Sequence, residues 1–267
     1  VYSQDFNFET NEIEIKDEGN IIEGKGGVIV TSNDNIVITS KESFYDKKKQ
    51  ELILKGNVVY KNTLKKISIQ AEKITYDRYN EVITTYGNTI FEDKLENFFL
   101  ETKSIEYKKK DGLIKTFDKT KIYIKNKYTV KADKIIFNQK KNLISSELEA
   151  DITDNKGNIF NFDNYIFDFK GEKVKAGNLN LIDSEKNNLI IKEAIIDLVK
   201  NEIVGKDTFK ISIEASSESG WKNIVGKDGV TVGLSTFGKS APYKDIYKLF
   251  NLTSDEIVKL AKAKVKK

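Results

Sequence analysis

The sequence predicts a mainly β fold: an elongated repeat β-jellyroll, built as a folded-over two-sheet solenoid, followed by a small C-terminal α/β fragment. Three observations support this prediction. Landmark residues recur at a nearly constant spacing, short alternations of apolar and polar residues fill the first 206 positions, and helical spacing appears only after about residue 240. We therefore assign residues 1–207 to a β-repeat domain and residues 208–267 to an α/β fragment.

The repeat is marked by an aromatic or aliphatic residue, often followed by aspartate, that returns every 29 to 31 residues. A period of this size is typical of arrays in which each unit buries its apolar face against its neighbours, rather than of a globule around one catalytic cleft. Six units are therefore expected between residues 36 and 206. These landmark residues are Tyr45, Tyr76, Tyr107, Phe137, Phe167 and Ile196, and a Gly-Asn pair recurs at Gly56-Asn57 and Gly87-Asn88.

Each unit is expected to consist of strands, because apolar side chains alternate with polar ones and so fall on one face. Turn formers that accept positive φ separate these stretches by two to four residues. Strands of roughly six to eight residues would be about 20 to 26 Å long, enough for one wall of a two-sheet sandwich. The alternating pairs include Ile36/Ile38, Leu52/Leu54, Ile67/Ile69, Ile122/Ile124, Phe160/Phe162 and Phe167/Phe169, and the turns include Glu18-Gly19-Asn20, Gly26-Gly27, Asn33-Asp34-Asn35, Lys110-Asp111-Gly112, Asn155 to Asn158 and Gly177-Asn178.

Composition narrows the possible functions. Hydrophobic residues make up 39% and charged residues 32%, and no apolar run approaches 18 residues, so we expect no transmembrane helix. The sequence contains neither Cys nor His, which excludes disulfides, zinc sites of the usual kind and a His-activated nucleophile. We therefore expect no catalytic residues, no metal and no cofactor. Because the chain starts at Val1 and contains no Met, we expect a mature or truncated product whose signal peptide is not visible.

The net charge of +4 does not indicate nucleic-acid binding. Residues 207–267 carry 11 lysines and 7 acids, which leaves 34 basic and 34 acidic residues in the rest of the chain. The two signs are interspersed there, whereas a nucleic-acid surface needs a concentrated basic stripe with stacking aromatics. Lys47-Lys48-Lys49 and Lys108-Lys109-Lys110 fall at turns, where solvated loops explain them; their alternative role is contact with anionic lipid headgroups.

Several short motifs in the repeat region resemble one known family. They are Lys-Gly-Asn-Val-Val at 55–59, Ala-Glu-Lys-Ile-Thr-Tyr-Asp at 71–77, Tyr-Gly-Asn-Thr-Ile at 86–90, Lys-Ala-Asp-Lys-Ile-Ile-Phe at 131–137, Lys-Lys-Asn-Leu-Ile-Ser-Ser at 140–146, Phe-Asp-Asn-Tyr at 162–165 and Ile-Val-Gly-Lys-Asp at 203–207. Their ordered recurrence over residues 6–207 resembles the OstA-like domains of lipopolysaccharide transport. The later motifs are more similar to the periplasmic N-terminal domain of the outer-membrane lipopolysaccharide-assembly protein LptD.

This resemblance implies a non-enzymatic domain, periplasmic and associated with the outer membrane, whose apolar jellyroll groove shields the acyl chains of lipopolysaccharide in passage to the outer membrane. It also implies docking with another jellyroll transport protein by edge-to-edge strand pairing. A trough between two sheets and exposed terminal edges suit both roles. For any single residue of the groove, ordinary core packing is the simpler role, so the hypothesis concerns the collective face. The lipid-groove candidates are Ile36, Ile38, Leu52, Leu54, Ile67, Ile69, Val82 and Ile122.

The sequence changes character after about Phe209. A strand is predicted at residues 211–216, and Pro242 is placed in the first turn of a helix that carries Tyr243, Ile246, Tyr247 and Phe250 at helical spacing. The segment Thr253 to Glu256 has the form of a capping box, which predicts a second helix. The apolar stripe of that helix comprises Ile257, Leu260, Ala261 and Val265.

This C-terminal part resembles the C-terminal end of transketolases over residues 209–267. The motifs are Ile-Ser-Ile-Glu-Ala-Ser at 211–216, Gly-Trp-Lys at 220–222, Val-Gly-Lys-Asp-Gly at 225–229, Thr-Phe-Gly-Lys-Ser-Ala-Pro at 236–242 and Phe-Asn-Leu-Thr at 250–253. The thiamine-diphosphate chemistry of that family resides in other parts of the enzyme and needs histidines that this chain lacks. We therefore expect no enzyme activity and no thiamine diphosphate binding.

Three functional hypotheses remain open. The first is a lipid conduit of lipopolysaccharide export that carries an extraneous α/β tail. The second is a transketolase-related protein, inactive as it stands, and the third is a ligand-free structural β-solenoid. A tightly filled interior is expected for the third and an open trough for the first.

Overall fold

The computed structural model describes residues 6–182, 184, 186, 188–200, 202–205, 209–217, 225, 229–234 and 242–265. The chain forms two compact units, residues 1–205 and 206–267. The first, here called the β unit, is mainly β, as the sequence predicts. The second is a small α/β unit, and the two are described separately.

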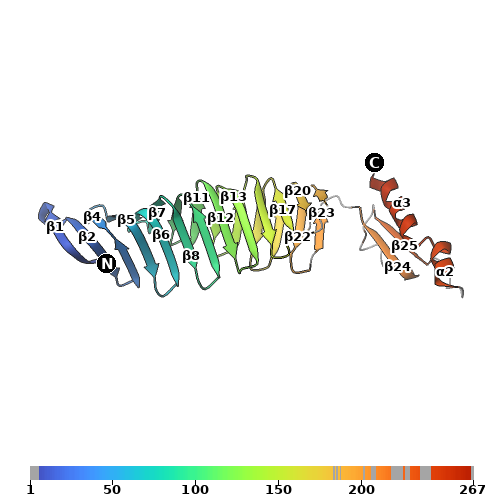
Figure 1. Cartoon of the computed structure of the whole chain (residues 1–267), viewed down its shortest axis with the longest axis horizontal. Coiled ribbons are helices and arrows are strands. Elements are labelled where there is room, and N and C mark those ends of the chain that lie inside the picture. The colour runs from blue at the N-terminus through green and yellow to red at the C-terminus, as the bar shows by residue number, and fades with distance from the viewer. Residues whose placement is uncertain are drawn as a thin grey trace. The chain divides into compact units, whose positions relative to one another are not determined.

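The strands of the β unit follow one another along a single stack in chain order (Figure 1). One 3-10 turn, η1 (Asp17–Gly19), interrupts them. The strands are β1 (Asn7–Lys16), β2 (Ile21–Ser32), β3 (Ile36–Ser40), β4 (Glu42–Asp46), β5 (Glu51–Asn62), β6 (Ile67–Asp77), β7 (Val82–Tyr86), β8 (Thr89–Asp93), β9 (Phe98–Thr102), β10 (Ile105–Lys108), β11 (Leu113–Thr116), β12 (Lys119–Ile124), β13 (Tyr128–Asp133), β14 (Ile136–Asn138), β15 (Leu143–Ser146), β16 (Ala150–Asp154), β17 (Ile159–Phe162), β18 (Tyr165–Asp168), β19 (Lys173–Ala176), β20 (Leu179–Ile182), β21 (Asn188–Ile191), β22 (Ala194–Asp197) and β23 (Glu202–Gly205).

Hydrogen bonds join these strands into one antiparallel sheet that folds over into two walls. Wall A contains β3, β8, β9, β12, β13, β16, β17, β20 and β21, paired in that order after β2, with β5 and β6 between β3 and β8. Wall B contains β4, β7, β10, β11, β14, β15, β18, β19, β22 and β23, again with β5 and β6 between β4 and β7. Each repeat therefore contributes one hairpin to each wall. Four long strands, β1, β2, β5 and β6, run through both walls.

The chain passes between the walls along one side of the stack, here called the corner. Gly26-Gly27 and Gly56-Asn57, predicted as turns, instead lie inside the long strands β2 and β5, where positive φ bends the strand from one wall into the other. Gly87-Asn88 performs the same bend between β7 and β8. Most strands are shorter than the predicted six to eight residues because the corner divides each passage between two walls.

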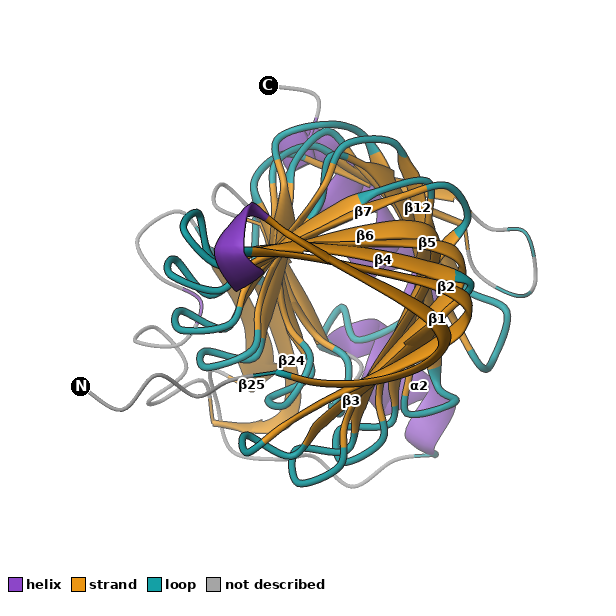
Figure 2. Cartoon of the chain, turned by 90° about the vertical axis from the view of Figure 1, so that its left-hand side faces the viewer, coloured by secondary structure: helices purple, strands orange, loops and turns teal. Residues whose placement is uncertain are grey.

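The landmark residues form one continuous inward-facing row in wall B. In register, each landmark pairs with an aliphatic residue of the next strand, as in Tyr45 with Leu52 and Leu52 with Tyr76. All six landmarks are buried. Figure 2, viewed from the β1 end of the stack, shows the strands of successive repeats superposed in the two walls. The row continues without a break through Ile83, Tyr107, Ile114, Phe137, Ile144, Phe167, Val174 and Ile196.

The aspartate that follows a landmark has a local role that explains its recurrence. Its Oδ1 accepts a hydrogen bond from the backbone N–H three residues on, at 3.0 Å for Asp46 and Lys49 and 2.9 Å for Asp77 and Asn80. This side chain closes the turn between two wall-B strands. The same bond recurs from Lys141 to Asn138, Gly171 to Asp168 and Lys200 to Asp197.

The turns opposite the corner are also hydrogen-bonded from one repeat to the next. The N–H of Arg78 donates to the carbonyl of Gln50 at 3.0 Å, and that of Lys109 donates to Glu81 at 3.0 Å. Both acceptor residues have φ near +54°. The positive φ turns each carbonyl toward the following repeat, so the stack is continuous at its turns as well as in its strands.

Gly87→Ala is expected to destabilise the β unit. Gly87 has φ +75°, which costs an L-residue about 1 to 2 kcal/mol, and a Cβ there would lie 2.5 Å from the Glu72 carboxyl group. That contact would also displace Glu72 from Asn88, whose Nδ2 donates to it at 3.1 Å. Urea unfolding followed by circular dichroism measures the loss.

Gly157→Ala is the matched control for this change. Gly157 has φ +88° with no atom within 4 Å of a built Cβ, so it isolates backbone strain. The alanine at position 87 should therefore lose more stability than the one at position 157. Wild-type stability in Gly87→Ala would contradict the role of this bend.

The α/β unit agrees with the elements predicted for it. Strand β24 (Ile211–Ser217) pairs in parallel with β25 (Val230–Leu234), and helices α2 (Tyr243–Leu249) and α3 (Ser254–Val265) follow. Pro242 lies at the N-cap of α2, one position before its first turn. Thr253 caps α3, since its Oγ1 accepts from the Glu256 N–H at 3.5 Å. The motifs at 220–222 and 236–241 lie outside the described residues, as do positions 226–228.

Candidate functional site

The interior between the two walls is the candidate site, and it is apolar along the whole stack. Its inward-facing side chains are mostly Ile, Leu, Val and Phe, and nearly all are less than 8% exposed. Seven of the eight predicted groove residues are buried there: Ile36, Ile38, Leu52, Leu54, Ile67, Ile69 and Ile122. Whether a lipid occupies this interior stays a prediction.

Val82 does not belong to that inward face. In β7 the buried positions are Ile83 and Thr85, whereas Val82 alternates with them and is half-buried on the outer face. Ile83 pairs with landmark residues on both sides, Tyr76 and Tyr107, which fixes the inward parity. Ile83 therefore replaces Val82 in the interior set.

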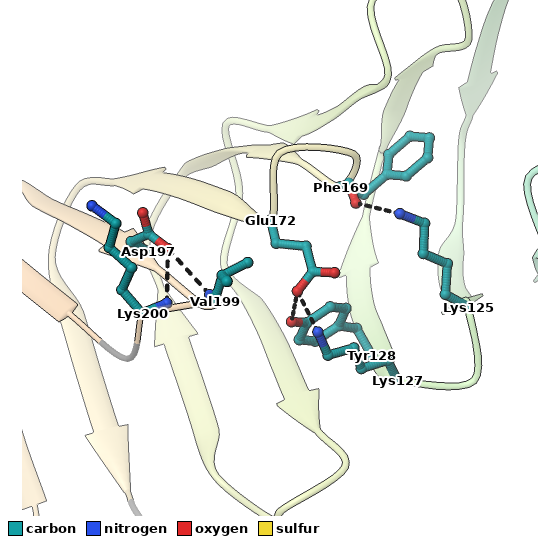
Figure 3. A network of polar contacts seen from close by, with 8 residues as sticks. All are labelled: Lys125, Lys127, Tyr128, Phe169, Glu172, Asp197, Val199 and Lys200. Carbon is teal, nitrogen blue, oxygen red and sulfur yellow. Dashed lines mark hydrogen bonds and ion pairs between the residues drawn. The ribbon is translucent and has the colours of Figure 1, made fainter.

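The side opposite the corner, here called the seam, is closed by side chains and not by the chain itself. In its C-terminal half, Lys125 and Lys127 of a wall-A turn reach a wall-B turn (Figure 3). Lys125 Nζ donates to the Phe169 carbonyl at 3.3 Å, and Lys127 Nζ pairs with Glu172. Tyr128 Oη donates to the same Glu172 carboxylate at 2.8 Å.

Other contacts close the middle of the seam. Gln139 Nε2 of wall B donates to Asp93 Oδ2 of wall A at 3.2 Å. Beneath them, the rings of Phe98 and Phe137 stack across the two walls with centroids 4.2 Å apart. The two walls are thus covalently continuous at the corner and joined at the seam by contacts that can separate without breaking a strand.

Glu172 is the most strongly held carboxylate of the seam. Partial burial acts to raise its pKa, but hydrogen bonds from Lys127 and Tyr128 outweigh that effect, so the pKa lies below its ordinary value. Burial, followed by the hydrogen bond to Glu172, raises the pKa of Tyr128, which therefore remains a donor at physiological pH. The ionised carboxylate is what joins the two turns.

The depressed pKa of Glu172 predicts acid-sensitive closure of the seam. A carboxyl group with a lowered folded pKa stabilises the fold fully above its ordinary value of 4.5, and this stabilisation is lost as pH falls through the lower folded pKa. Glu172→Gln should therefore cost about 1 to 3 kcal/mol at pH 7 and make the unfolding free energy less dependent on pH below 4.5. Urea unfolding at pH 7 and pH 3 measures both effects.

Glu147→Gln serves as the control for this pair of measurements, because Glu147 is exposed in a turn. It should leave the pH dependence of unfolding unchanged. Asp197, whose pKa is lowered first by the Lys200 backbone N–H, keeps part of the acid sensitivity in every variant. Equal pH dependence in Glu172→Gln and the wild type would rule out the Glu172 contacts as the acid-sensitive element.

The N-terminal half of the seam is built from tyrosines and cations. Arg78 Nη1 donates to Tyr45 Oη at 3.5 Å, and Lys109 Nζ donates to Tyr76 Oη at 2.8 Å. Burial lowers the pKa of Lys109 and raises that of Tyr107 to about 12. Burial likewise raises the pKa of Tyr60 and of Tyr76.

Sequence reasoning missed the position two residues after each landmark, here called the rim position. Its members are cationic in the first half of the stack and an amide or apolar in the second half. The missed signal was the repeat period itself, which aligns residues that otherwise look like ordinary turn residues. The rim positions are Lys47, Arg78, Lys109, Gln139, Phe169 and Leu198.

Both ends of the stack present strand edges. β1 pairs only with β2, and β21 and β23 each pair with a single neighbour among the described strands. At the first end, Ile13 and Ile15 of β1 are 54% and 62% exposed. They pair with Gly24 and Ile22, which places them on the inner face where no further strand covers them.

The described residues contain no cluster of three or more His, Cys, Asp or Glu side chains placed to hold a metal ion. In the same part of the chain, no helix combines the length and apolar character needed to cross a membrane.

The fold and site define a folded-over β-jellyroll unit joined to a small α/β unit, and comparison with known proteins bears on the second. The family model of the transketolase-like C-terminal domain matches residues 193–253. The transketolase of Sinorhizobium medicae is 40% identical over 67 residues, 25% of this chain and 10% of that enzyme. The chloroplastic transketolase of Solanum tuberosum is 46% identical over 55 residues, 21% of this chain and 7% of that enzyme.

The C-terminal part is therefore transketolase-like in sequence, as expected, while the chain spans a tenth or less of the length of these relatives. The match begins at residue 193 and so includes β22 and β23, which the structure pairs into wall B of the β unit.

Among solved structures, the periplasmic lipopolysaccharide-transport component LptH of Pseudomonas aeruginosa aligns over 65% of this chain and 82% of its own, at 13% identity and a TM-score of 0.22. The TCP10 domain of Danio rerio CPAP aligns over 68% of this chain and 98% of its own, at 10% identity and a TM-score of 0.14. The resemblance of residues 6–207 to OstA-like domains stays a prediction from the sequence motifs.

Proposed function

We propose that the β unit is a non-enzymatic lipid carrier that takes acyl chains between its two walls during lipopolysaccharide transport to the outer membrane. The observation that supports this most is the seam: a continuous apolar interior is covalently closed at the corner only. Opening the seam would separate side-chain contacts such as Gln139 with Asp93 while leaving the strand pairing of each wall intact. A periplasmic location and strand-edge docking with another jellyroll belong to the same proposal.

The energetics favour occupation once the seam separates. Each buried CH₂ of an acyl chain contributes about 0.8 kcal/mol, so one chain of about ten carbons gains on the order of 8 kcal/mol. The polar contacts given up at the seam are worth about 0.5 to 3 kcal/mol each. Several acyl chains would therefore offset the loss of the few contacts that close one stretch of the seam.

Photo-crosslinking to lipopolysaccharide tests the proposal in the full chain. Photoreactive residues at Ile38, Leu54 and Ile69 face the interior, whereas Lys41 and Lys55 are exposed at the corner. Val37 and Ile53 add controls on the outer face of the same strands. Crosslinks confined to the three interior positions are expected; equal crosslinking inside and outside, or none in a folded protein, would refute the carrier role.

A ligand-free structural solenoid is the second candidate, and the tight packing of the interior favours it. Ile38, Leu54 and Ile69 are fully buried, and the Phe98 and Phe137 rings are in direct contact. Such a protein would bind no lipid at any position. The crosslinking experiment therefore separates the two candidates.

The transketolase-like part adds no activity in this proposal. The sequence has no His, and the matched segment is a small fraction of the enzyme. Isothermal titration with thiamine diphosphate and Mg²⁺ should give no binding heat, and saturable binding would favour a transketolase-related role instead.

A further inference from the structure

We propose that Arg78 and Lys109, with the hydroxyls of Tyr45 and Tyr76, form a subsite at the seam for the phosphate or carboxylate group of an amphipathic ligand. This inference rests on the proposed carrier function and adds the chemical group that the ligand presents to the seam. The apolar part of the ligand would lie in the interior below, and the anionic group would remain at the rim.

The two cations occupy the same place in successive repeats. Each sits at the rim position and reaches back to the landmark tyrosine of the preceding repeat, 33 residues earlier: Arg78 to Tyr45 and Lys109 to Tyr76. Successive repeats are two strands apart, so the two cations are separated by about 10 Å along the stack. An anion at the seam can therefore be approached by one cation from each of two repeats.

Hydrogen-bond donors exceed acceptors at this place. Tyr45 and Tyr76 each accept a hydrogen bond from a cation, and within the described part of the chain neither hydroxyl has an acceptor for its own hydrogen. Arg78 uses one of its five donors in a long contact of 3.5 Å. An oxyanion would supply the acceptors that this arrangement lacks.

The surrounding carboxylates do not satisfy these donors. Glu81 Oε1 lies 3.9 Å from Lys109 Nζ, beyond hydrogen-bonding distance, and among the described residues no carboxylate forms an ion pair with Arg78. Asp34 acts on Lys109 only at longer range, where Lys65 and Arg78 oppose it. The Lys109 side chain is nonetheless only 8% exposed, so its charge is poorly solvated.

The identity of the first cation is also informative. Arg78 is the only arginine in the sequence, against 44 lysines. Its guanidinium lies 5.0 Å above the Phe6 ring, between an apolar surface and the rim. A planar guanidinium binds phosphate or carboxylate with two parallel hydrogen bonds, which an ammonium group cannot do.

Isothermal titration of the full chain with decyl phosphate, 1-decanol and inorganic phosphate tests this subsite. Wild-type protein is expected to bind decyl phosphate about tenfold or more tightly than decanol, since hydrogen bonds to charged groups contribute about 1.5 to 3 kcal/mol. Arg78→Gln and Lys109→Gln should each lose this preference while retaining decanol binding. Arg78→Lys should keep part of it, and thermal unfolding confirms that the variants are folded.

Lys47→Gln is the matched control, because Lys47 holds the rim position of the preceding repeat but is exposed; it should behave as wild type. Equal affinity of the wild type for decyl phosphate and decanol would overturn the subsite and leave the carrier function standing. Inorganic phosphate bound as tightly as decyl phosphate would overturn the amphipathic ligand in favour of free phosphate. Binding of none of the three ligands would overturn both proposals.

Discussion

Phe98→Ala is expected to lower the unfolding free energy of the β unit by about 3 to 5 kcal/mol. Phe98 begins β9 in wall A, is 1% exposed and stacks on Phe137 of wall B. Its ring also lies 6.2 Å from Phe169, another wall-B residue. Removing it therefore leaves a cavity at the one place where large rings join the walls beneath the seam, and urea unfolding followed by circular dichroism measures the cost.

Phe99→Ala is the control for this substitution. Phe99 is the next residue along β9, but it is half-buried on the outer face, where its ring lies 5.8 Å from that of Tyr123. The chemical change is identical, whereas the buried volume lost is smaller. Similar losses for the two variants would mean that Phe98 does not hold the walls together.

Ile69→Asp is expected to have the second large effect, a loss of at least about 4 kcal/mol, because it places an unpaired carboxylate in the apolar interior. Ile69 is fully buried in β6 and pairs with Tyr60 and Phe91 in wall A. In a repeat array each unit contacts only its neighbours, so the damage should be local. Hydrogen exchange should show lost protection in β5, β6 and β8, with β16 to β23 remaining protected.

Gln70→Asp tests whether burial causes the effect. Gln70 is the next residue in β6 and is exposed, so the same carboxylate there should change stability by less than about 0.5 kcal/mol. Loss of protection along the whole stack in Ile69→Asp would contradict nearest-neighbour stabilisation. Full protection in that variant would show that the interior at Ile69 is accessible to water.

The sequence was sufficient to predict the repeat and the two-wall fold, because period and alternation follow directly from stacking and burial. It could not predict that Gly26-Gly27 and Gly56-Asn57 bend continuous strands, since the same residues also form chain reversals. Nor did it indicate positive φ at Gln50 or Glu81. Neither residue type favours that conformation, and the hydrogen bond to the next repeat selects it.

The interior set was predicted correctly except at Val82. Val82 and Ile83 are both apolar, so alternation alone leaves the parity of β7 open, and only the pairing of Ile83 with Tyr76 decides it. The seam was harder to predict, because its contacts join turns from different repeats. Lys109 in particular was assigned to a solvated lysine run, whereas its side chain folds back over the Tyr76 ring at 4.8 Å.

The central claim is that acyl chains enter the interior through the seam, and locking the seam tests it most directly. Because the sequence has no cysteine, Asp93→Cys with Gln139→Cys can be joined by a short bis-maleimide, with Phe99→Cys and Tyr123→Cys joined on the outer face as the control. Uptake of a photoreactive lipid into the interior should be largely lost in the seam-locked protein and unchanged in the control. Equal uptake in both locked proteins would contradict entry through the seam.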